Sequence, residues 1–308
     1  MDVAAQFLVA GIGLGSLYAL FAYGVSLVWS VSRTLNFAHG EMVMAGVFAS
    51  IVALSLGASP VSSILTAAGL SAVLGLCLYK GVYQPLSRRG SSPLVWVLGI
   101  VVFAALVRDV SSLVFETGTY PAPIAVGGDG LVSVGSVVFR AAYVWVFLIS
   151  AGAAAAMEWT IARTSFGRAV RATAASRETA ELMGIHTEKV TALVFVAAAV
   201  LGTLAGILIA PLTFVSVSFG WVLTMKGFTA AVLGGLGRGK GALVGGLLLG
   251  VFEQLLTLGE FAASDGASHL FAAGYRDAAI FLLLILVLVW RPSGLVPALG
   301  TDTRGTKR

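Results

Sequence analysis

The sequence predicts an all-α polytopic membrane protein with about 8–9 transmembrane helices, some of them short or broken. Of its 308 residues, 58% are hydrophobic and only 11% are charged, whereas a soluble domain carries about 25% charged residues. The mean hydropathy of +0.98 agrees with this composition. A water-soluble fold this apolar would lack the polar surface that keeps it dissolved. We therefore expect residues 1–308 to form a single transmembrane domain.

An apolar stretch of about 20 residues crosses the hydrocarbon core of a bilayer as a helix. The candidate spans are residues 4–30, 42–57, 61–79, 94–115, 139–161, 188–210, 222–234, 241–257 and 274–290. The first is long enough to tilt or break, and the 222–234 segment is too short to cross alone. The first apolar stretch is also longer than a signal-peptide core and has no basic region before it, so we expect it to be retained as a span.

The basic residues give the predicted bundle a direction, because Lys and Arg are retained on the cytoplasmic side. If the odd spans run from outside to inside, only Arg108, Arg140, Lys226 and Arg276 of the 19 basic residues fall at or near the outer side. The N-terminus is then predicted outside and the C-terminus inside. This bias accounts for the net charge of +5, and no basic and aromatic stripe of the kind that binds nucleic acid is present.

Small residues predict close packing between some of these helices. They recur at four-residue spacing as Gly11 and Gly15, Gly202 and Gly206, and Gly246 and Gly250. Such pairs let helix backbones approach closely in lipid, and they indicate a bundle rather than a function. Cys77 is the only cysteine, so an internal disulfide or a cysteine-based metal site is excluded. We expect it to be a small buried hydrophobe.

A polar run, Arg33 to Glu41, interrupts the first two spans. Irregular backbone at membrane depth is tolerated where protein covers it or where it lines a cavity, and ionisable residues there suggest a functional site. Asn36 and His39 are candidates to hydrogen-bond a polar solute or to close a gate. Glu41 is expected either to pair with Arg33 or to begin the next helix, where an acid suits the helix dipole. A short inner loop with a capped helix explains these residues equally well.

The segment 162–190 is the longest predicted cytoplasmic stretch, and it mixes charges of both signs. Ser176 is a plausible N-cap for a short helix of about two turns, and Gly184 is suited to end it. Thr187 is expected to cap the following span, with Glu188 in its first turn. The apolar residues of this short helix could enter a groove in a partner, although a solvated amphipathic loop fits the pattern as well. On the outer side, the polar and turn-rich loop 116–138 faces either a soluble partner or solvent.

A glycine-rich run from Gly234 to Gly241 nearly matches a phosphate-binding loop. Gly241 stands where that motif needs a Ser or Thr hydroxyl for magnesium, and no strand precedes the run. We therefore expect a tight turn between a short helix and a full span. No catalytic motif and no metal-ligating cluster is present in the sequence, so it gives no support to an enzyme activity.

Three runs carry a resemblance to a known family: Gly15 to Leu20 followed by Asn36 to Glu41; Arg168-Ala169 followed by Ala180 to Ile185; and Lys226 to Gly237. They resemble the signatures of the permease subunits of branched-chain amino acid ABC importers, in the family's order and over nearly the whole chain. The family also includes permeases for urea and short amides. The motifs are specific to the family and do not specify one substrate.

The resemblance implies a multi-pass permease of the bacterial cytoplasmic (inner) membrane that works with partner chains. These are a second homologous permease subunit, two cytoplasmic ABC ATPases and a periplasmic substrate-binding protein. The chain itself would hold no cofactor, because ATP and Mg would bind the ATPases. The segment 177–185 would be the coupling helix. The expected ATPase-coupling residues are Arg177, Glu178, Ala180, Glu181, Leu182, Met183, Gly184 and Ile185.

The leading hypothesis is therefore a permease subunit that imports branched-chain amino acids or similar small polar solutes. Asn36, His39 and Glu41 would line or gate the translocation path. The alternatives are a stand-alone channel or secondary carrier for a small polar solute such as urea, and a structural membrane scaffold. The stretches 31–41 and 211–228 are candidates for related breaks in two halves of the bundle, because internal repeats are common in transporter folds.

Overall fold

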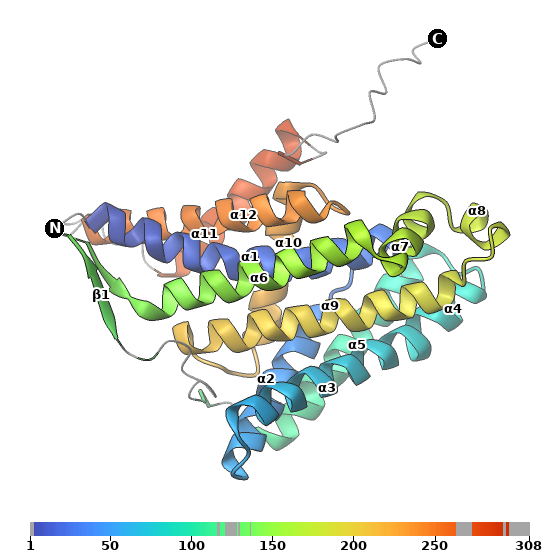
Figure 1. Ribbon diagram of the computed structural model, residues 1–308, viewed down its shortest axis with the longest axis horizontal. Helices are drawn as coiled ribbons and strands as arrows, with labels where there is room; N and C mark the ends of the chain where they lie inside the picture. Colours follow the sequence, from blue (N-terminus) through green and yellow to red (C-terminus); the bar gives the residue numbers. More distant parts are fainter. Residues whose placement is uncertain are drawn as a thin grey trace.

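The computed structural model describes residues 3–115, 118–120, 128, 130–135, 137–262, 273–291 and 294–295. These residues form a helical bundle (Figure 1). Among the described residues, six helical stretches are long and apolar enough to cross a membrane. They are α1 (Val3–Ser32), α3 (Pro60–Leu78) with its extension to Arg88, α5 (Pro93–Val114), α6 (Ala141–Arg163), α9 (Thr187–Ile209) with its extension to Leu212, and α11 (Gly239–Ala262).

Three further apolar helices are shorter: α2 (His39–Ser55), α10 (Phe219–Gly234) and α12 (Ala273–Trp290). Each predicted span therefore corresponds to a helix, and the expectation that the 222–234 segment is a short helix is confirmed. The extension of α3 consists of a π-helical turn, Tyr79–Tyr83, followed by α4 (Gln84–Arg88). The extension of α9 is a single 3₁₀ turn, Ala210–Leu212.

The bundle has two distinct ends (Figure 1). At the hairpin end lie the start of α1 and the antiparallel strands β1 (Leu131–Val134) and β2 (Val137–Arg140), paired from Leu131 with Arg140 to Val134 with Val137. At the α8 end lie α4, α7 (Ser165–Ala175) and α8 (Arg177–Leu182). The hairpin occupies part of the predicted loop 116–138 and was not expected. The rest of that loop lies largely outside the described residues.

Helix α1 is packed against α11 through glycines on both helices. A Cβ atom on Gly250 would lie 2.2 Å from the Cα atom of Gly15, and one on Gly246 would lie 2.1 Å from the backbone nitrogen of Ala19. A Cβ atom on Gly11 would lie 2.9 Å from the Cα atom of Val251. No larger residue fits at these positions without separating the helices, so the packing role predicted from the four-residue spacing is confirmed.

Two helices begin inside the bundle rather than at its surface. Helix α1 ends at Ser32, and Arg33 takes a left-handed backbone conformation with φ of 54° that turns the chain back. Helix α2 then begins at His39, whose ring lies beside Phe21, well before the end of α1. After α9 and its 3₁₀ turn, the chain likewise turns back through residues 213–218, and α10 begins at Phe219. The predicted stretches 31–41 and 211–228 thus each contain a helix break, at residues 33–38 and 213–218, whereas residues 219–228 already belong to α10.

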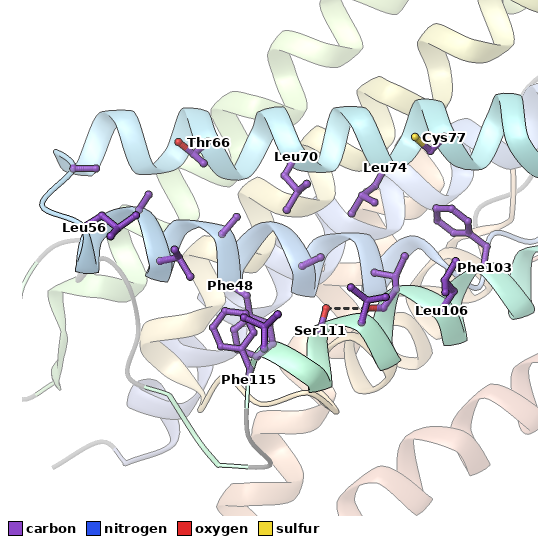
Figure 2. A pocket seen from close by; sticks show the side chains of 18 residues that line it. Phe48, Leu56, Thr66, Leu70, Leu74, Cys77, Phe103, Leu106, Ser111 and Phe115 are labelled. Carbon is purple, nitrogen blue, oxygen red and sulfur yellow. Dashed lines mark hydrogen bonds between the residues drawn. The ribbon is translucent and has the colours of Figure 1, made fainter.

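An apolar groove of about 820 Å³ runs between α2, α3 and α5 (Figure 2). Phe48 and Phe115 stack at one end of it with ring centroids 4.0 Å apart. Cys77 lies along its α3 side and is exposed. The expectation that Cys77 is buried is therefore wrong. Cys77 faces outward because the core-facing side of α3 is formed by Ser71, Gly75 and Leu78.

Candidate translocation site and coupling surface

His39 is enclosed between α1, α2 and α9. Its ring meets Phe21 edge to face, with centroids 4.5 Å apart. Two glycines make room for it, because a Cβ atom on Gly24 would lie 3.1 Å from Nε2 and one on Gly202 only 2.7 Å from it. The residue is fully buried, and neither ring nitrogen has a hydrogen-bond partner. A buried polar ring without partners is costly, which marks this position as more than packing.

Glu41 lies in the first turn of α2 with its side chain 2% exposed. Its Oε1 atom is 4.0 Å from Nη1 of Arg108, and its Oε2 atom has no hydrogen-bond partner. The predicted alternative that Glu41 pairs with Arg33 is wrong, because Arg33 instead donates a hydrogen bond to the carbonyl of Ala174 on α7. The other alternative, that Glu41 begins the next helix, is confirmed.

The first turns of α2 and α10 meet at this place. A Cβ atom on Gly40 would lie 2.0 Å from the carbonyl oxygen of Gly220, so the two backbones are in direct contact. The backbone N–H of Gly40 donates to Oγ1 of Thr224 at 3.0 Å, which in turn donates to the Gly220 carbonyl at 2.9 Å. Each helix N-terminus carries a partial positive charge. The carboxylate of Glu41 thus lies beside two such ends.

Asn36 completes the break between α1 and α2. Its side-chain Oδ1 accepts a hydrogen bond from the backbone N–H of Ala38 at 3.2 Å, which closes a local turn. Its Nδ2 is buried without a partner. The structure therefore brings Asn36, His39 and Glu41 together at one break, as the sequence suggested. Arg108 and Thr224 belong to the same place and were missed, although an arginine within the apolar stretch 94–115 was a usable signal.

The segment 162–190 is more helical than the sequence suggested. Thr164 caps α7 by accepting a hydrogen bond from the backbone N–H of Gly167 at 3.2 Å, and this helix was not expected. Ser176 caps α8 by accepting from the backbone N–H of Thr179, as predicted. Gly184 has φ of 79° and ends the turn after α8, also as predicted. The prediction for Thr187 is wrong, because His186 occupies the N-cap position of α9 and Thr187 is the first helical residue.

The apolar residues of α8 divide between two faces. Leu182 and Met183 are 84% and 76% exposed. Ala180 is buried at 2% exposure, and Ile185 is half-buried against the core. The apolar residues expected to be presented to a partner were Ala180, Leu182, Met183 and Ile185. The expectation is wrong for Ala180, because its side of α8 packs the short helix onto the bundle. Exposed apolar side chains next to charged ones are typical of an interaction site.

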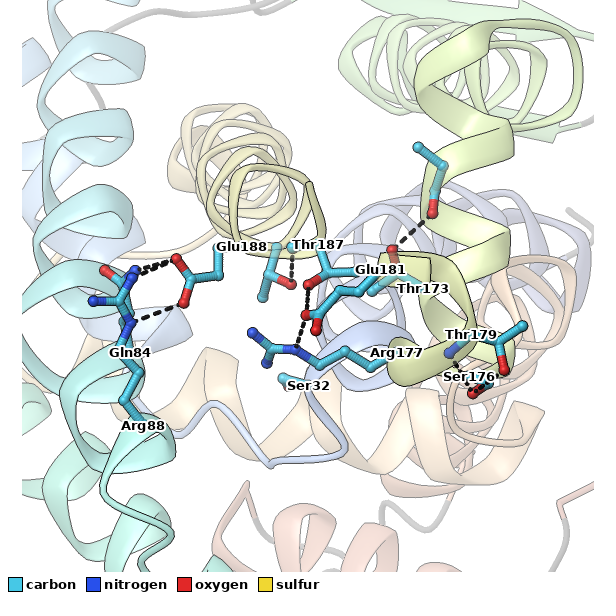
Figure 3. A network of polar contacts seen from close by, with 12 residues as sticks. Ser32, Gln84, Arg88, Thr173, Ser176, Arg177, Thr179, Glu181, Thr187 and Glu188 are labelled. Atoms are coloured by element: carbon cyan, nitrogen blue, oxygen red, sulfur yellow. Dashed lines mark hydrogen bonds and ion pairs between the residues drawn. The ribbon is translucent and has the colours of Figure 1, made fainter. Parts of the chain in front are cut away.

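Polar contacts hold α8 in place at this end (Figure 3). Arg177 donates to Glu181 at 3.2 Å within α8, and the hydroxyl of Thr187 on α9 donates to the same carboxylate. Glu188 accepts from Nη2 of Arg88 at 2.6 Å and from Gln84 at 2.9 Å, which joins α9 to α4. Glu181 and the residues from Gly184 to Lys189 also line a cavity of about 450 Å³. We call α8, with Met183, Gly184 and Ile185, the coupling surface.

The contact of α8 with α9 is expected to depend on pH in the acid range. Hydrogen bonds from Thr187 and then Arg177 hold the pKa of the Glu181 carboxyl below its usual value. Because the folded pKa is lowered, the stabilisation is present above the unfolded pKa of about 4.3 and is lost as the pH falls through the folded pKa. Protection of the amides of residues 177–185 against hydrogen exchange should be constant near neutral pH and fall only in acid.

The variant Thr187→Val supplies the comparison for this pH dependence. It removes the hydroxyl that contributes most to lowering the pKa of Glu181, so protection should be lost at a higher pH than in the parent chain. Thr160→Val, which removes an exposed hydroxyl on α6, should leave the pH profile unchanged. Coincident profiles for the parent and Thr187→Val would show that Glu181 does not hold α8 on α9.

The glycine-rich run 234–241 forms the turn between α10 and α11, as expected. Gly235 and Gly237 have φ of 99° and 80°, which residues with a side chain rarely adopt. A Cβ atom on Gly234 would lie 1.8 Å from the carbonyl oxygen of Gly241, so the turn is closed on itself. Within the described part of the chain, no group of His, Cys, Asp and Glu residues is placed to hold a metal ion.

Comparison with known proteins gives matches over almost the full length. The family model described as the permease component of the branched-chain amino acid transport system matches residues 7–288. The high-affinity branched-chain amino acid permease protein BraD of Pseudomonas aeruginosa is 31% identical, over 94% of this chain and 95% of its own. LivH of Salmonella typhimurium is 33% identical over 93% of both chains. A probable LivH of Methanocaldococcus jannaschii is 25% identical over 95% of this chain and 91% of its own.

Proposed function

Because the chain belongs to the family of branched-chain amino acid permease components, we propose that it is the membrane-spanning permease subunit of an ATP-driven importer. The match along nearly the whole chain carries this conclusion. The cargo would be branched-chain amino acids or similar small polar solutes. The stand-alone channel or carrier is disfavoured, because the relatives are named as the permease proteins of high-affinity branched-chain amino acid transport systems.

We propose that the α8 end faces the cytoplasm and the hairpin end faces outward. The basic side chains near the α8 end are Arg33, Arg88, Arg163, Arg168, Arg171, Arg177 and Lys189. Their number at one end is what the retention of positive charge on the cytoplasmic side predicts. The N-terminus would then lie outside and the C-terminus inside, with 8–9 crossings or partial crossings in the bacterial inner membrane.

The coupling surface would receive one of two cytoplasmic ABC ATPases, which bind the ATP and Mg. Its exposed Leu182 and Met183 supply apolar anchors, and Arg177, Glu178 and Glu181 supply a charged rim. This division resembles protein interfaces in general, with apolar contacts at the centre and polar groups around them. A second, homologous permease and a periplasmic substrate-binding protein would complete the importer. The chain itself would act as a non-enzymatic translocation subunit.

Asn36, His39 and Glu41 are proposed to line or gate the translocation path. They supply hydrogen-bonding groups without partners at the point where α2 and α10 meet. In transporters, broken helices place their N-termini at the site of a polar solute near the middle of the membrane. The first turns of α2 and α10 meet in this manner, with Gly40 against Gly220.

Substitution of His39 tests this role without changing the volume of the ring greatly. His39→Phe should lower solute uptake about tenfold, because the ring nitrogens that are proposed to hydrogen-bond the solute are lost while the packing of the ring on Phe21 is kept. Uptake of radiolabelled leucine by cells with the complete importer measures it, with membrane abundance determined in parallel. The control is Ser150→Ala on α6, which removes a buried hydroxyl that likewise has no hydrogen-bond partner. This variant should leave uptake unchanged. A scaffold role predicts full uptake for His39→Phe and Asn36→Ala.

Reconstitution decides between the importer and its alternative. Vesicles with the permease pair, the ATPases and the binding protein should accumulate solute only when ATP is present. Substrate-stimulated ATP hydrolysis, tested with leucine, urea and short amides, would identify the cargo. Uptake in vesicles that contain this chain without any ATPase would overturn the proposed function.

A further inference from the structure

A small cavity lies beside the second helix break, between α1, the end of α9 and the start of α10. Its volume is about 160 Å³. A cavity needs only ~10–15 Å³ of such volume to hold one water molecule, so this one has room for several water-sized groups. The polar groups in its wall are Tyr18, Thr213, Ser216, Ser218 and Lys226. The cavity thus matches the head group of an amino acid, which consists of an amine, one carbon and a carboxylate.

Lys226 contributes a cation to this wall from within a membrane-embedded helix. Its Nζ atom donates to Oε1 of Glu253 on α11 at 2.6 Å, and it lies 5.8 Å from the centre of the Tyr18 ring. The side chains of Lys226 and Glu253 are only 15% and 11% exposed. The second oxygen of Glu253 is buried without a hydrogen-bond partner. This acid therefore keeps an acceptor position that the ion pair does not use.

Stability alone does not account for this ion pair. Burying two charges costs so much desolvation that apolar residues of similar volume hold helices together equally well. In membrane-spanning helices, ionisable residues are rare and mark the paths of solutes or ions. The pair lies between α10 and α11, which already pack closely through their glycines: a Cβ atom on Gly245 would lie 2.1 Å from the carbonyl oxygen of Ala230.

We propose that Lys226 binds the carboxylate of a transported amino acid in this cavity, with the hydroxyls of Ser216 and Ser218 as further donors. Glu253 is a positioning residue, which accepts a hydrogen bond from Nζ of Lys226 and holds the lysine side chain at the cavity wall. The proposal rests on the proposed function and narrows its cargo to solutes with a carboxylate. Urea and short amides are uncharged and have no carboxylate, so they could not form an ion pair with Lys226.

Paired substitutions test this assignment, because a single change at either residue would leave a buried charge without its partner. Lys226→Met combined with Glu253→Met keeps the side-chain bulk and removes both charges. Lys226→Glu combined with Glu253→Lys keeps an ion pair and reverses the charge in the cavity wall. Trp221→Phe, on the exposed side of the same helix, is the control. Each is measured in cells with the complete importer, by uptake of radiolabelled leucine and by membrane abundance.

Both paired variants should be present in the membrane at parental abundance and should lower leucine uptake about 10- to 100-fold, since a hydrogen bond to a charged group is lost in each. Parental uptake by the reversed pair would overturn the proposal, because it would show that the pair only joins α10 to α11. Reduced abundance of both variants without lower uptake per molecule would overturn it as well. If the parent imported urea or acetamide but no amino acid, the lysine assignment would fail while the importer remained. If the parent imported none of these probes, the proposed function itself would fail.

Discussion

Gly40→Leu is expected to destabilise the folded bundle. The added side chain would begin 2.0 Å from the carbonyl oxygen of Gly220 and 2.2 Å from Oγ1 of Thr224. The first obstacle is backbone, so α2 and α10 would have to separate, and overpacking of this kind costs about 3 kcal/mol or more. Purified protein in detergent should show a melting midpoint lower by about 5–10 °C, with a reduced monodisperse yield.

Gly69→Leu is the matched control for this steric effect. Gly69 lies on α3 with nothing within 4 Å of an added Cβ atom, so the same substitution has space there. Its melting midpoint should remain near the parental value. If Gly40→Leu melted at the temperature of Gly69→Leu, α2 and α10 would not be in contact at their first turns, and the site built on that contact would be withdrawn.

Replacement of both exposed apolar residues of α8 should uncouple the permease from its ATPases. Leu182→Glu combined with Met183→Glu puts two charges where the proposed interface needs apolar anchors. Loss of an interface hot spot costs about 2 kcal/mol or more, so the two changes should weaken ATPase binding about 100-fold or more. The permease should still fold, because both side chains are exposed. Copurification of the ATPase and ATP-driven leucine uptake should both be lost.

Leu131→Glu controls for the added charge. Leu131 is 70% exposed on β1, at the opposite end of the bundle. It should leave ATPase copurification intact, since the proposed interface is at the α8 end. Normal ATPase binding by the double variant would show that the ATPases dock elsewhere. Loss of binding in both variants would point to a general effect of charge on folding.

Much of the fold could be read from the sequence because transmembrane helices are local structures. Each predicted span became a helix, and the small-residue pair Gly246 and Gly250 packs as its spacing indicated. Ser176 and Gly184 were likewise identifiable as the ends of a short helix, because capping depends on neighbouring residues. The hairpin was missed, since its strands are short and lie in a polar segment. Helix α7 was missed because it is short and its apolar residues alternate with Arg168, Arg171 and Thr173.

The sequence could not predict three features of the side chains: the exposure of Cys77, the burial of Ala180 and the partner of Glu41. Each depends on which side of a helix faces the core, and that side is chosen by packing against elements far away in the chain. Arg33 was the nearest basic residue to Glu41 in sequence, yet the turn at Arg33 directs its side chain to α7 instead. Arg108, from a helix more than sixty residues later, takes its place.

The sequence by itself determined the class of protein, the positions of its helices and its family, because hydrophobicity, charge bias and motif order are properties of the linear chain. The tertiary structure alone decided which residues of the broken helices come into contact. It brought Gly40 against Gly220 and Lys226 against Glu253. The apolar stretches of the sequence predict where the helices lie along the chain. The rotation of each helix and its position in the bundle follow from close packing of its small residues against neighbouring helices.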